Sequence, residues 1–445
     1  MPRPTVRVDP DFGPHLRELR MERGLSYRKF AELVHYSHPY LIELEHGTRK
    51  PSKELASHLD TKLHANGTLA RLVTEPGETP SPPPADPTQL VAGNWRREDA
   101  ETLASQLIAE PPTASDAVRL VLNWLVTEPP QIYELRAGRR IGLGTVATVE
   151  KRAHQLRLLD DHVAGGDTRK VVAEELDATM KLLREASYTD QVGKRLLRAL
   201  AELCQLAGWV SSDAGRYAEA RRIFLVGVRA GHAAGDWPGA ANNLSSLAYQ
   251  VANVGDPREA MTLAAAAYRG SEGTASATTR ALLLERLAWT SARAAEPGQA
   301  DRALGRVDEA YAQRRPEDDP AWVYWLDADE IAIMAGRCWT QLRRPLRAVP
   351  VLEEATKHYT ADRARETALY LTWLSEAYLL ANEVDASANT ALRALRLSRQ
   401  ANSVRTRERV GALFGLLLPH HGNVAVDEFL DECRAAGISL VSATA

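Results

Sequence analysis

The sequence predicts an all-α protein with a small N-terminal domain followed by a larger body of repeated helix pairs. Three observations support this fold class. Residues 12–74 carry short apolar patterns of helical period between residues that begin and end helices. Residues 75–94 hold six prolines and no apolar period, which predicts an extended, semi-rigid linker. In residues 95–440, rich in Ala, Leu, Arg and Glu, similar segments recur about every forty residues.

The length and charge of the chain agree with this division. A chain of 445 residues is long enough for two or three domains. The formal net charge is −3, yet the first 74 residues hold 12 Lys and Arg against 9 Asp and Glu. A mildly basic head on an acidic body fits a DNA-binding module joined to a second functional part.

The three cysteines lie far apart, which favours a reducing compartment, so a cytoplasmic location is expected. No cysteine lies near a second cysteine or a histidine at zinc-finger spacing, so no metal and no cofactor are expected. The N-terminus has no apolar segment of secretory length, and no run of about 18 apolar residues occurs that could span a membrane.

Four or five short helices are expected in residues 12–74. In the first, Leu16 and Leu19 share one face, and Gly24 is suited to a left-handed stop. Pro39 falls in the first turn of the third helix, where no intrahelical N–H is lost, and Gly47 ends that helix. The residues suited to N-cap the second, third and fourth helices are Ser26, Ser37 and Ser52.

The short turn at Tyr36 and Ser37 separates two of these helices, which is a helix-turn-helix pattern. Residues 14–64 resemble the phage-repressor or Xre/Cro-type DNA-binding domain in the segments "LRELRMERGLS", "KFAELV" and "SHPYLIELEHGTRKPS". The resemblance covers about fifty consecutive residues. It implies a helix laid in a DNA groove, and it implies that Glu45 is a framework residue bonded inside the domain.

The same resemblance implies which residues meet DNA. Base-facing positions fall at the third helix, where Glu43 could accept from a cytosine amino group and an apolar side chain could pack on a thymine methyl. These positions, with their neighbours, are Ser37, His38, Pro39, Tyr40, Ile42 and Glu43. Phosphate contacts are expected from the flanking residues Tyr27, Arg28, Lys29, Thr48, Arg49 and Lys50. Tyr27, Ile42 and Glu43 depart from the residues common in the family, so a docking module without DNA binding is the alternative.

The body repeats a helix end, a tight turn and the start of a second helix. The small residues of the second helices are Ala220, Ala260, Ala300, Ala348 and Ser387, at steps of 40, 40, 48 and 39. A lone helix pair cannot bury its apolar face, so such repeats stack into a solenoid. Residues 145–190 are expected to add a helix pair at the start, and residues 423–437 to cap the far end.

The small-large pattern resembles tetratricopeptide repeats, which run about 34 residues. The best matches to that consensus are Gly208, Gly215, Tyr217, Ala220 and Phe224. Head, proline-rich linker and body together resemble a large group of actinobacterial Xre-type regulators with tetratricopeptide-like C-terminal domains. This resemblance implies a transcription factor.

In solenoids of this kind the first helix of each pair lines the concave face. The positions expected there are Trp209, Asn242, Ser245, Tyr249, Glu285, Trp289, Glu330, Arg337 and Glu376. Aromatic and charged groups on one surface could hold a peptide or a small molecule. Packing between helices is the alternative for the tryptophans, and the group Trp322, Trp325 and Trp339 is assigned to the core.

No catalytic motif is found, so the protein is not expected to be an enzyme. The segment "RRIGLGTV" has a lone G-x-G without a phosphate-binding lysine, and no G-x-S-x-G occurs. The sequence therefore predicts a transcriptional regulator that reads an operator in double-stranded DNA as a homodimer and binds an effector in its repeats. The alternative is a repeat-based interaction scaffold whose head no longer binds DNA.

Overall fold

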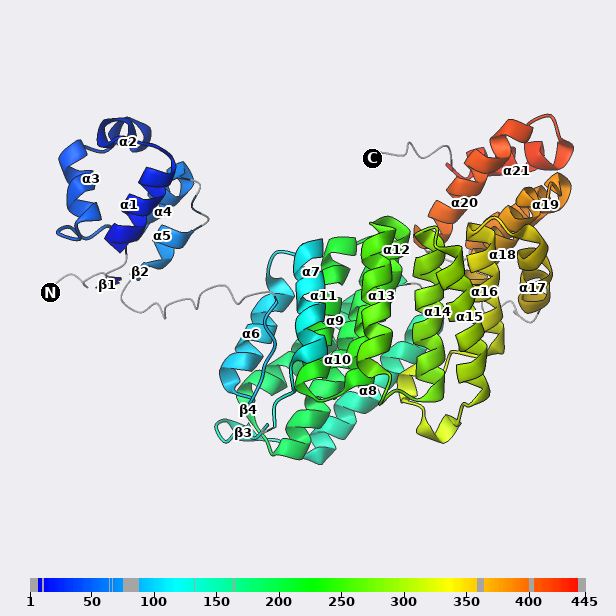
Figure 1. Cartoon of the computed structure of the whole chain (residues 1–445), viewed down its shortest axis with the longest axis horizontal. Coiled ribbons are helices and arrows are strands. Elements are labelled where there is room, and N and C mark those ends of the chain that lie inside the picture. Colours follow the sequence, from blue (N-terminus) through cyan, green and yellow to red (C-terminus); the bar gives the residue numbers. More distant parts are fainter. Residues whose placement is uncertain are drawn as a thin grey trace. The chain divides into compact units, whose positions relative to one another are not determined.

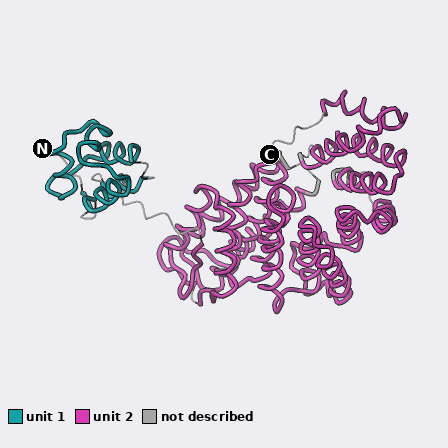
Figure 2. The backbone as a smooth tube through the Cα atoms, turned by 45° about the horizontal axis from the view of Figure 1, so that its top comes forward, with its two compact units in different colours: residues 1–85 teal, residues 86–445 magenta. Residues whose placement is uncertain are grey.

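The computed structural model describes residues 7–9, 12–63, 65, 67–74, 88–131, 133–162, 165–357, 364–399 and 404–438. The chain forms two compact units, residues 1–85 and residues 86–445 (Figure 2). The expected all-α class is confirmed: an N-terminal helix-turn-helix unit precedes a helical body (Figure 1). Residues 75–87 of the predicted linker lie outside the described residues.

The first unit packs its helices around one apolar core. The elements are β1 (Arg7–Val8), α1 (Phe12–Glu22), α2 (Tyr27–Val34), α3 (His38–Glu45), α4 (Lys53–Leu63), α5 (Thr68–Arg71) and β2 (Val73–Thr74). Leu16, Phe30 and Leu41 are among its fully buried side chains. The antiparallel pair of β1 and β2 was not predicted, because two-residue strands are too short to show an alternating pattern.

The caps of these helices explain where they begin and end. The Ser26 hydroxyl accepts from the backbone N–H of Lys29 at 3.3 Å. Ser37 occupies the N-cap position of α3 but makes no side-chain cap hydrogen bond. Gly24 and Gly47 have φ of +61° and +68°, in the left-handed region that ends a helix at low steric cost.

The second unit is a series of helices. They are α6 (Arg97–Ile108), α7 (Ala114–Val126), α8 (Leu143–His162), α9 (Gly165–Glu185), α10 (Asp190–Asp213), α11 (Tyr217–Ala233), α12 (Trp237–Val254), α13 (Pro257–Ser271), α14 (Ala277–Arg293), α15 (Pro297–Ala312), α16 (Ala328–Gln341), α17 (Pro345–Lys357), α18 (Ala364–Leu380), α19 (Val384–Ser398), α20 (Val404–Leu417) and α21 (Val424–Ala435). Two short strands, β3 (Arg139–Arg140) and β4 (Ala186–Ser187), pair in parallel beside them.

Successive helices pair, and the pairs stack. The pairs α10/α11, α12/α13, α14/α15, α16/α17 and α18/α19 stand side by side (Figure 1). The first helix of each pair also contacts the first helix of the next, from α10 to α20. The predicted helix pair within residues 145–190 is present as α8 and α9, and α21 follows at the far end, as predicted.

Small residues allow the paired helices to approach closely. Ala220, Ala260, Ala300, Ala348 and Ser387 are all fully buried. A Cβ added at Gly208 would lie 2.5 Å from the ring of Phe224, and one at Gly336 would lie 2.5 Å from Leu352. The repeat spacing therefore marks inter-helix contacts, as expected for a stacked fold.

The uneven step in the repeat has a structural consequence. The interval of 48 residues between Ala300 and Ala348 contains the long connection from α15 to α16, residues 313–327, with the 3₁₀ turns η1 (Pro316–Asp318) and η2 (Ala321–Val323). The connection reaches back across the stack, because η2 contacts α8. The ring of Tyr324 lies 6.3 Å from that of His154 on α8.

Residues 88–94, assigned to the linker from their sequence, lie against the second unit. The Asn123 side chain donates to the Thr88 carbonyl at 2.8 Å, and a ring nitrogen of His232 lies 3.1 Å from the Val91 carbonyl. Thr88 is buried, and Leu90 and Val91 pack on the apolar core. The body thus begins before Trp95.

Candidate functional site

A buried ion pair organises the helix-turn-helix unit. Arg20 of α1 donates from Nε to Glu45 Oε1 at 2.6 Å and from Nη2 to Oε2 at 3.0 Å. Its third nitrogen, Nη1, donates to the Leu25 carbonyl at 2.9 Å, and its guanidinium stacks 3.9 Å from the Tyr27 ring centroid. The hydrogen bond to Glu45 raises the pKa of Arg20. The framework role predicted for Glu45 is confirmed.

Tyr27 takes part in this cluster, so its hydroxyl is not available in the way the sequence predicted. We expected a phosphate contact, but the hydroxyl donates to Glu45 Oε2 at 2.6 Å. Burial and then this hydrogen bond raise the pKa of Tyr27. The first turn of α2 still presents the exposed side chains of Arg28 and Lys29.

The positions implied for DNA contact lie at the outer side of α3 and the segments around it. The exposed members are Arg28, Lys29, Ser37, His38, Pro39, Thr48, Arg49 and Lys50, and the half-buried members are Tyr27, Tyr40, Ile42 and Glu43. Glu43 and Arg49 form an ion pair at 3.3 Å, and Arg49 lies 4.6 Å from the ring centroid of Tyr40. The implied base-reading carboxylate and one implied phosphate contact are therefore neighbours.

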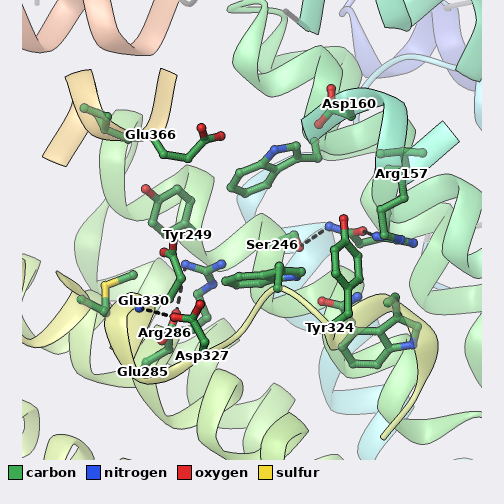
Figure 3. A pocket seen from close by; sticks show the side chains of 18 of the residues that line it. Arg157, Asp160, Ser246, Tyr249, Glu285, Arg286, Tyr324, Asp327, Glu330 and Glu366 are labelled. Atoms are coloured by element: carbon green, nitrogen blue, oxygen red, sulfur yellow. Dashed lines mark hydrogen bonds and ion pairs between the residues drawn. The ribbon is translucent and has the colours of Figure 1, made fainter. Parts of the chain in front are cut away.

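The second unit contains a cavity of about 370 Å³ (Figure 3). Its walls come from the first helices of successive pairs, α8, α10, α12, α14, α16, α18 and α20, and from the connection between α15 and α16. In the view of Figure 3, one side carries Tyr249, Glu285, Arg286 and Glu330, and the other side carries Arg157, Asp160 and Tyr324. The cavity joins side chains that are far apart in the sequence.

The structure brings together most of the positions predicted for the concave face. The six that line the cavity are Trp209, Asn242, Tyr249, Glu285, Glu330 and Arg337. Ser245 instead donates to the Asn242 carbonyl at 3.0 Å, and Glu376 accepts from Arg409 at 2.6 Å. The fully buried Trp289 packs edge-to-face on Trp373, with centroids 5.2 Å apart.

Several lining residues were not among the predicted positions. Trp322 and Trp325 were assigned to the core; both pack on it, and both also line the cavity. Trp339 also packs on the core, but unlike the other two tryptophans it does not line the cavity. Arg286 directly follows the predicted Glu285, and Arg405 comes from α20, beyond the last repeat recognised in the sequence. The repeat spacing could not predict that Arg405 lines the cavity.

The charges of three arginines act on Tyr249. Arg337 Nη2 donates to the Tyr249 hydroxyl at 2.8 Å, and the Arg286 guanidinium lies 4.6 Å from the ring centroid. Burial acts to raise the pKa of Tyr249, but the charges of Arg337, Arg405 and Arg286 and the hydrogen bond from Arg337 lower it to about 8. This end of the cavity is electrostatically positive.

The carboxylates of the cavity differ in how the protein holds them. Glu330 accepts from the Tyr370 hydroxyl at 2.6 and 2.9 Å, and Asp327 caps α16 by accepting from the Glu330 N–H at 2.9 Å. Glu285 is only 2% exposed, and its Oε2 has no hydrogen-bond partner among the described residues. Burial raises the pKa of Glu285 to about 7, against the opposing charge of Arg286.

Comparison with known families identifies the first unit. A model described as a helix-turn-helix domain matches residues 11–73. No curated protein matches the chain. Within the described ranges, no helix is long and apolar enough to cross a membrane, and no group of His, Cys, Asp and Glu is arranged to hold a metal ion.

Proposed function

We propose that this protein is an Xre-type transcriptional regulator whose tetratricopeptide-like body senses a small effector in the cavity. The observation that carries the proposal is the joining of a helix-turn-helix domain to a helical stack with a cavity lined by charged and aromatic side chains. A regulator of this kind acts in the cytoplasm and needs no catalytic centre.

DNA binding rests on the arrangement of the first unit. The buried Arg20–Glu45 pair fixes α1 against the end of α3, so the outer side of α3 is presented on a rigid frame. Arg28 and Lys29 lie on one flank and Lys50 on the other, where charges would neutralise phosphates. The N-termini of α2 and α3 add backbone N–H donors.

We further propose that two copies read one operator. A single unit with one recognition helix contacts only a few base pairs, which is poor selectivity against a genome. A two-fold dimer doubles the site and places the half-sites about one helical turn apart or a multiple of it. The helical body has the area for a dimer interface. Light scattering at micromolar concentration, with and without DNA, should report a dimer; a monomer under both conditions contradicts this part.

The cavity supports sensing because buried ionisable side chains stabilise the packing of helices less than apolar side chains would. Apolar side chains would hold a helical stack together, whereas Glu285 and Arg337 are ionisable side chains that are only 2% and 5% exposed. A cavity of this size and mixed lining is typical of a small-molecule site. Residues 88–94 are anchored on α7 and α11, so the start of the body can transmit a change in the stack toward the linker.

The DNA-binding proposal is tested by selection of genomic fragments with the full-length protein. Arg49→Ala with Lys50→Ala should weaken binding to all DNA sequences alike. It should also lower the slope of the logarithm of the binding constant against the logarithm of the salt concentration by about one for each lost phosphate contact. Glu43→Ala should instead relax preference at one or two base pairs. Arg17→Ala, which removes an exposed charge of α1, is the matched control. Unchanged selectivity in Glu43→Ala means that Glu43 reads no base.

The sensing proposal is tested by the response of DNA affinity to small-molecule fractions. A fraction that shifts the affinity of the wild-type chain should act differently on Asn242→Ala, which changes the cavity lining. Gln299→Ala, an exposed amide of α15, should respond as the wild type does. An equal response in both variants places the sensor elsewhere.

One observation favours the alternative of a scaffold whose head does not bind DNA. Arg49, an implied phosphate contact, is already paired with Glu43 at 3.3 Å. If the head is a docking module, binding to DNA will be weak and without sequence preference, and the same selection experiment will return no motif.

A further inference from the structure

The inference begins with two buried arginines that lack a hydrogen-bonded counter-ion. Arg286 and Arg337 line the cavity and are 7% and 5% exposed. Among the described residues, Arg337 makes one hydrogen bond, to the neutral hydroxyl of Tyr249. Arg286 makes none; its nearest acid is Glu285, with Nη1 to Oε1 at 3.6 Å. Two guanidiniums therefore use one of their ten N–H donors on the protein.

Two half-buried arginines nearby have a carboxylate at or near hydrogen-bonding distance. Arg409 donates to Glu376 at 2.6 Å, and Arg405 lies 3.5 Å from a carboxylate oxygen of Asp213. Arg409 thus has a hydrogen-bonded carboxylate, which neither Arg286 nor Arg337 has among the described residues. Burying a guanidinium without a hydrogen-bonded carboxylate is unfavourable, so an anionic ligand best explains the two arginines in the cavity wall.

The carboxylates close to these arginines do not fill that role. Glu330 is engaged by Tyr370, and Asp327 by the N-terminus of α16. Glu285 is close to Arg286, but burial raises its pKa to about 7, so it is half neutral near physiological pH. The lowered pKa of Tyr249 agrees with the positive charges of Arg337, Arg405 and Arg286 around it.

The remaining walls set the shape of the ligand. Trp209 and Tyr249 lie with ring centroids 5.8 Å apart, and the ring centroid of Trp325 lies 5.7 Å from the Arg286 guanidinium. Flat aromatic surfaces favour a flat partner. A volume of 370 Å³ corresponds to about twelve water volumes, which suits a ligand of roughly ten to fifteen non-hydrogen atoms and not a long peptide.

We propose that the effector is a small planar carboxylate, with its carboxylate held by Arg286 and Arg337 beside the Tyr249 hydroxyl and its ring against Trp209 and Trp325. The inference deepens the sensing function proposed above and rests on it. A guanidinium pair matches the two oxygens of a carboxylate. A phosphate dianion carries twice the charge and would be repelled by Glu285 and Glu330, both of which line the same cavity.

The test compares ligands that share one ring and differ in charge. Phenyl, naphthyl and indolyl rings, each carrying an acetate, an acetamide or an ethylamine, are titrated calorimetrically into the full-length protein, with phenyl phosphate as the dianionic probe. At least one acetate should bind tenfold or more tightly than its amide and its amine. Tighter binding of an amine or of the phosphate, or no binding by any acetate, overturns the inference.

Variants locate the anion. Arg337→Gln should weaken the tightest acetate at least tenfold, and Arg337→Lys should recover part of the loss because it keeps the charge but not the fork. Arg302→Gln removes an exposed arginine of α15 and should not change the binding of the acetate. If the acetate binds the Arg337→Gln variant with the same affinity as the wild type, its carboxylate is not held at this site.

A spectroscopic measurement keeps the test valid if Arg337→Gln does not fold. An anion next to Tyr249 raises the pKa of its hydroxyl, so the acetate should lower the tyrosinate absorbance of the wild type near pH 8, and the matching amide should not. The difference should vanish in Tyr249→Phe. An absorbance change that persists in Tyr249→Phe contradicts the placement of the carboxylate.

DNA affinity with and without the same probes separates this inference from the proposed function. If an acetate binds at Arg337 but leaves DNA affinity unchanged, the ligand class stands and the sensing function fails. If only an amine or a phosphate binds and shifts DNA affinity, the sensing function stands and the carboxylate inference fails.

Discussion

The two units of the protein each bury an arginine against a tyrosine, and they do so with opposite results. In the first unit, Arg20 stacks on Tyr27 and donates from all three nitrogens, two of them to Glu45. In the second unit, Arg337 contacts Tyr249 and aromatic faces but has no carboxylate partner among the described residues. A completed set of hydrogen bonds rigidifies the structure, whereas an incomplete one beside a cavity leaves donors for the ligand proposed above.

The largest effect that this comparison predicts is for Glu45→Ala. It leaves the Arg20 guanidinium buried without its anion and should destabilise the first unit by about 3–5 kcal/mol. Chemical denaturation of the full-length protein, monitored by a signal that reports on the first unit, measures the loss of unfolding free energy. Glu22→Ala, which removes an exposed carboxylate of α1, is the control and should change little. Equal effects of the two variants would mean that the buried pair contributes no more than a surface charge.

A smaller effect, with the opposite sign, is predicted for Glu285→Gln. Burial raises the pKa of Glu285 from 4.5 to about 7 in the folded state, where Arg286 on its own helix and Glu330 and Arg337 on α16 act on it. The contribution of the protonated Glu285 carboxyl to the free energy of unfolding is fully present below about pH 4.5. It is lost as the pH rises through about 7 and the buried carboxyl ionises. Gln stays neutral, so the variant should be more stable than the wild type by about 3 kcal/mol at pH 8.

The pH dependence supplies the check on that prediction. Thermal unfolding of the ligand-free protein at pH 8, 7, 6 and 5 should show the advantage of Glu285→Gln shrinking at each step. Glu309→Gln, at an exposed position of α15, should show no such trend. An advantage that does not vary with pH would show that the pKa of Glu285 is the same in the folded and the unfolded protein, so that burial does not raise it.

The smallest effect is predicted for Arg337→Met in the absence of ligand. Since no carboxylate loses its partner, the change in unfolding free energy should stay within about 1 kcal/mol of the wild type or favour the variant. Chemical denaturation at pH 7 measures it. A loss as large as that of Glu45→Ala would show that Arg337 is a structural residue after all, and it would remove the contrast between the two arginines.

The sequence by itself determined the features that depend on neighbours along the chain. Helix caps at Ser26, the left-handed stop at Gly24 and the small residues such as Ala220 and Ala260 all lie where local pattern predicted them. The helix-turn-helix domain was recognisable for the same reason, because its motif lies within a short continuous segment whose matched residues run from 11 to 73.

Only the tertiary structure decided the cavity. Adjacent residues of a helix point about 100° apart, so Ser246 lines the cavity while Ser245 does not, and a small error in the predicted face exchanges them. The connection from α15 to α16 brings Trp325 onto the lining, and α20 adds Arg405. The partners of Arg337 lie on α12, α14 and α18, so no local pattern could show that it lacks a carboxylate. Whether a buried charge is paired depends on contacts between distant segments, and these exist only once the stack has formed.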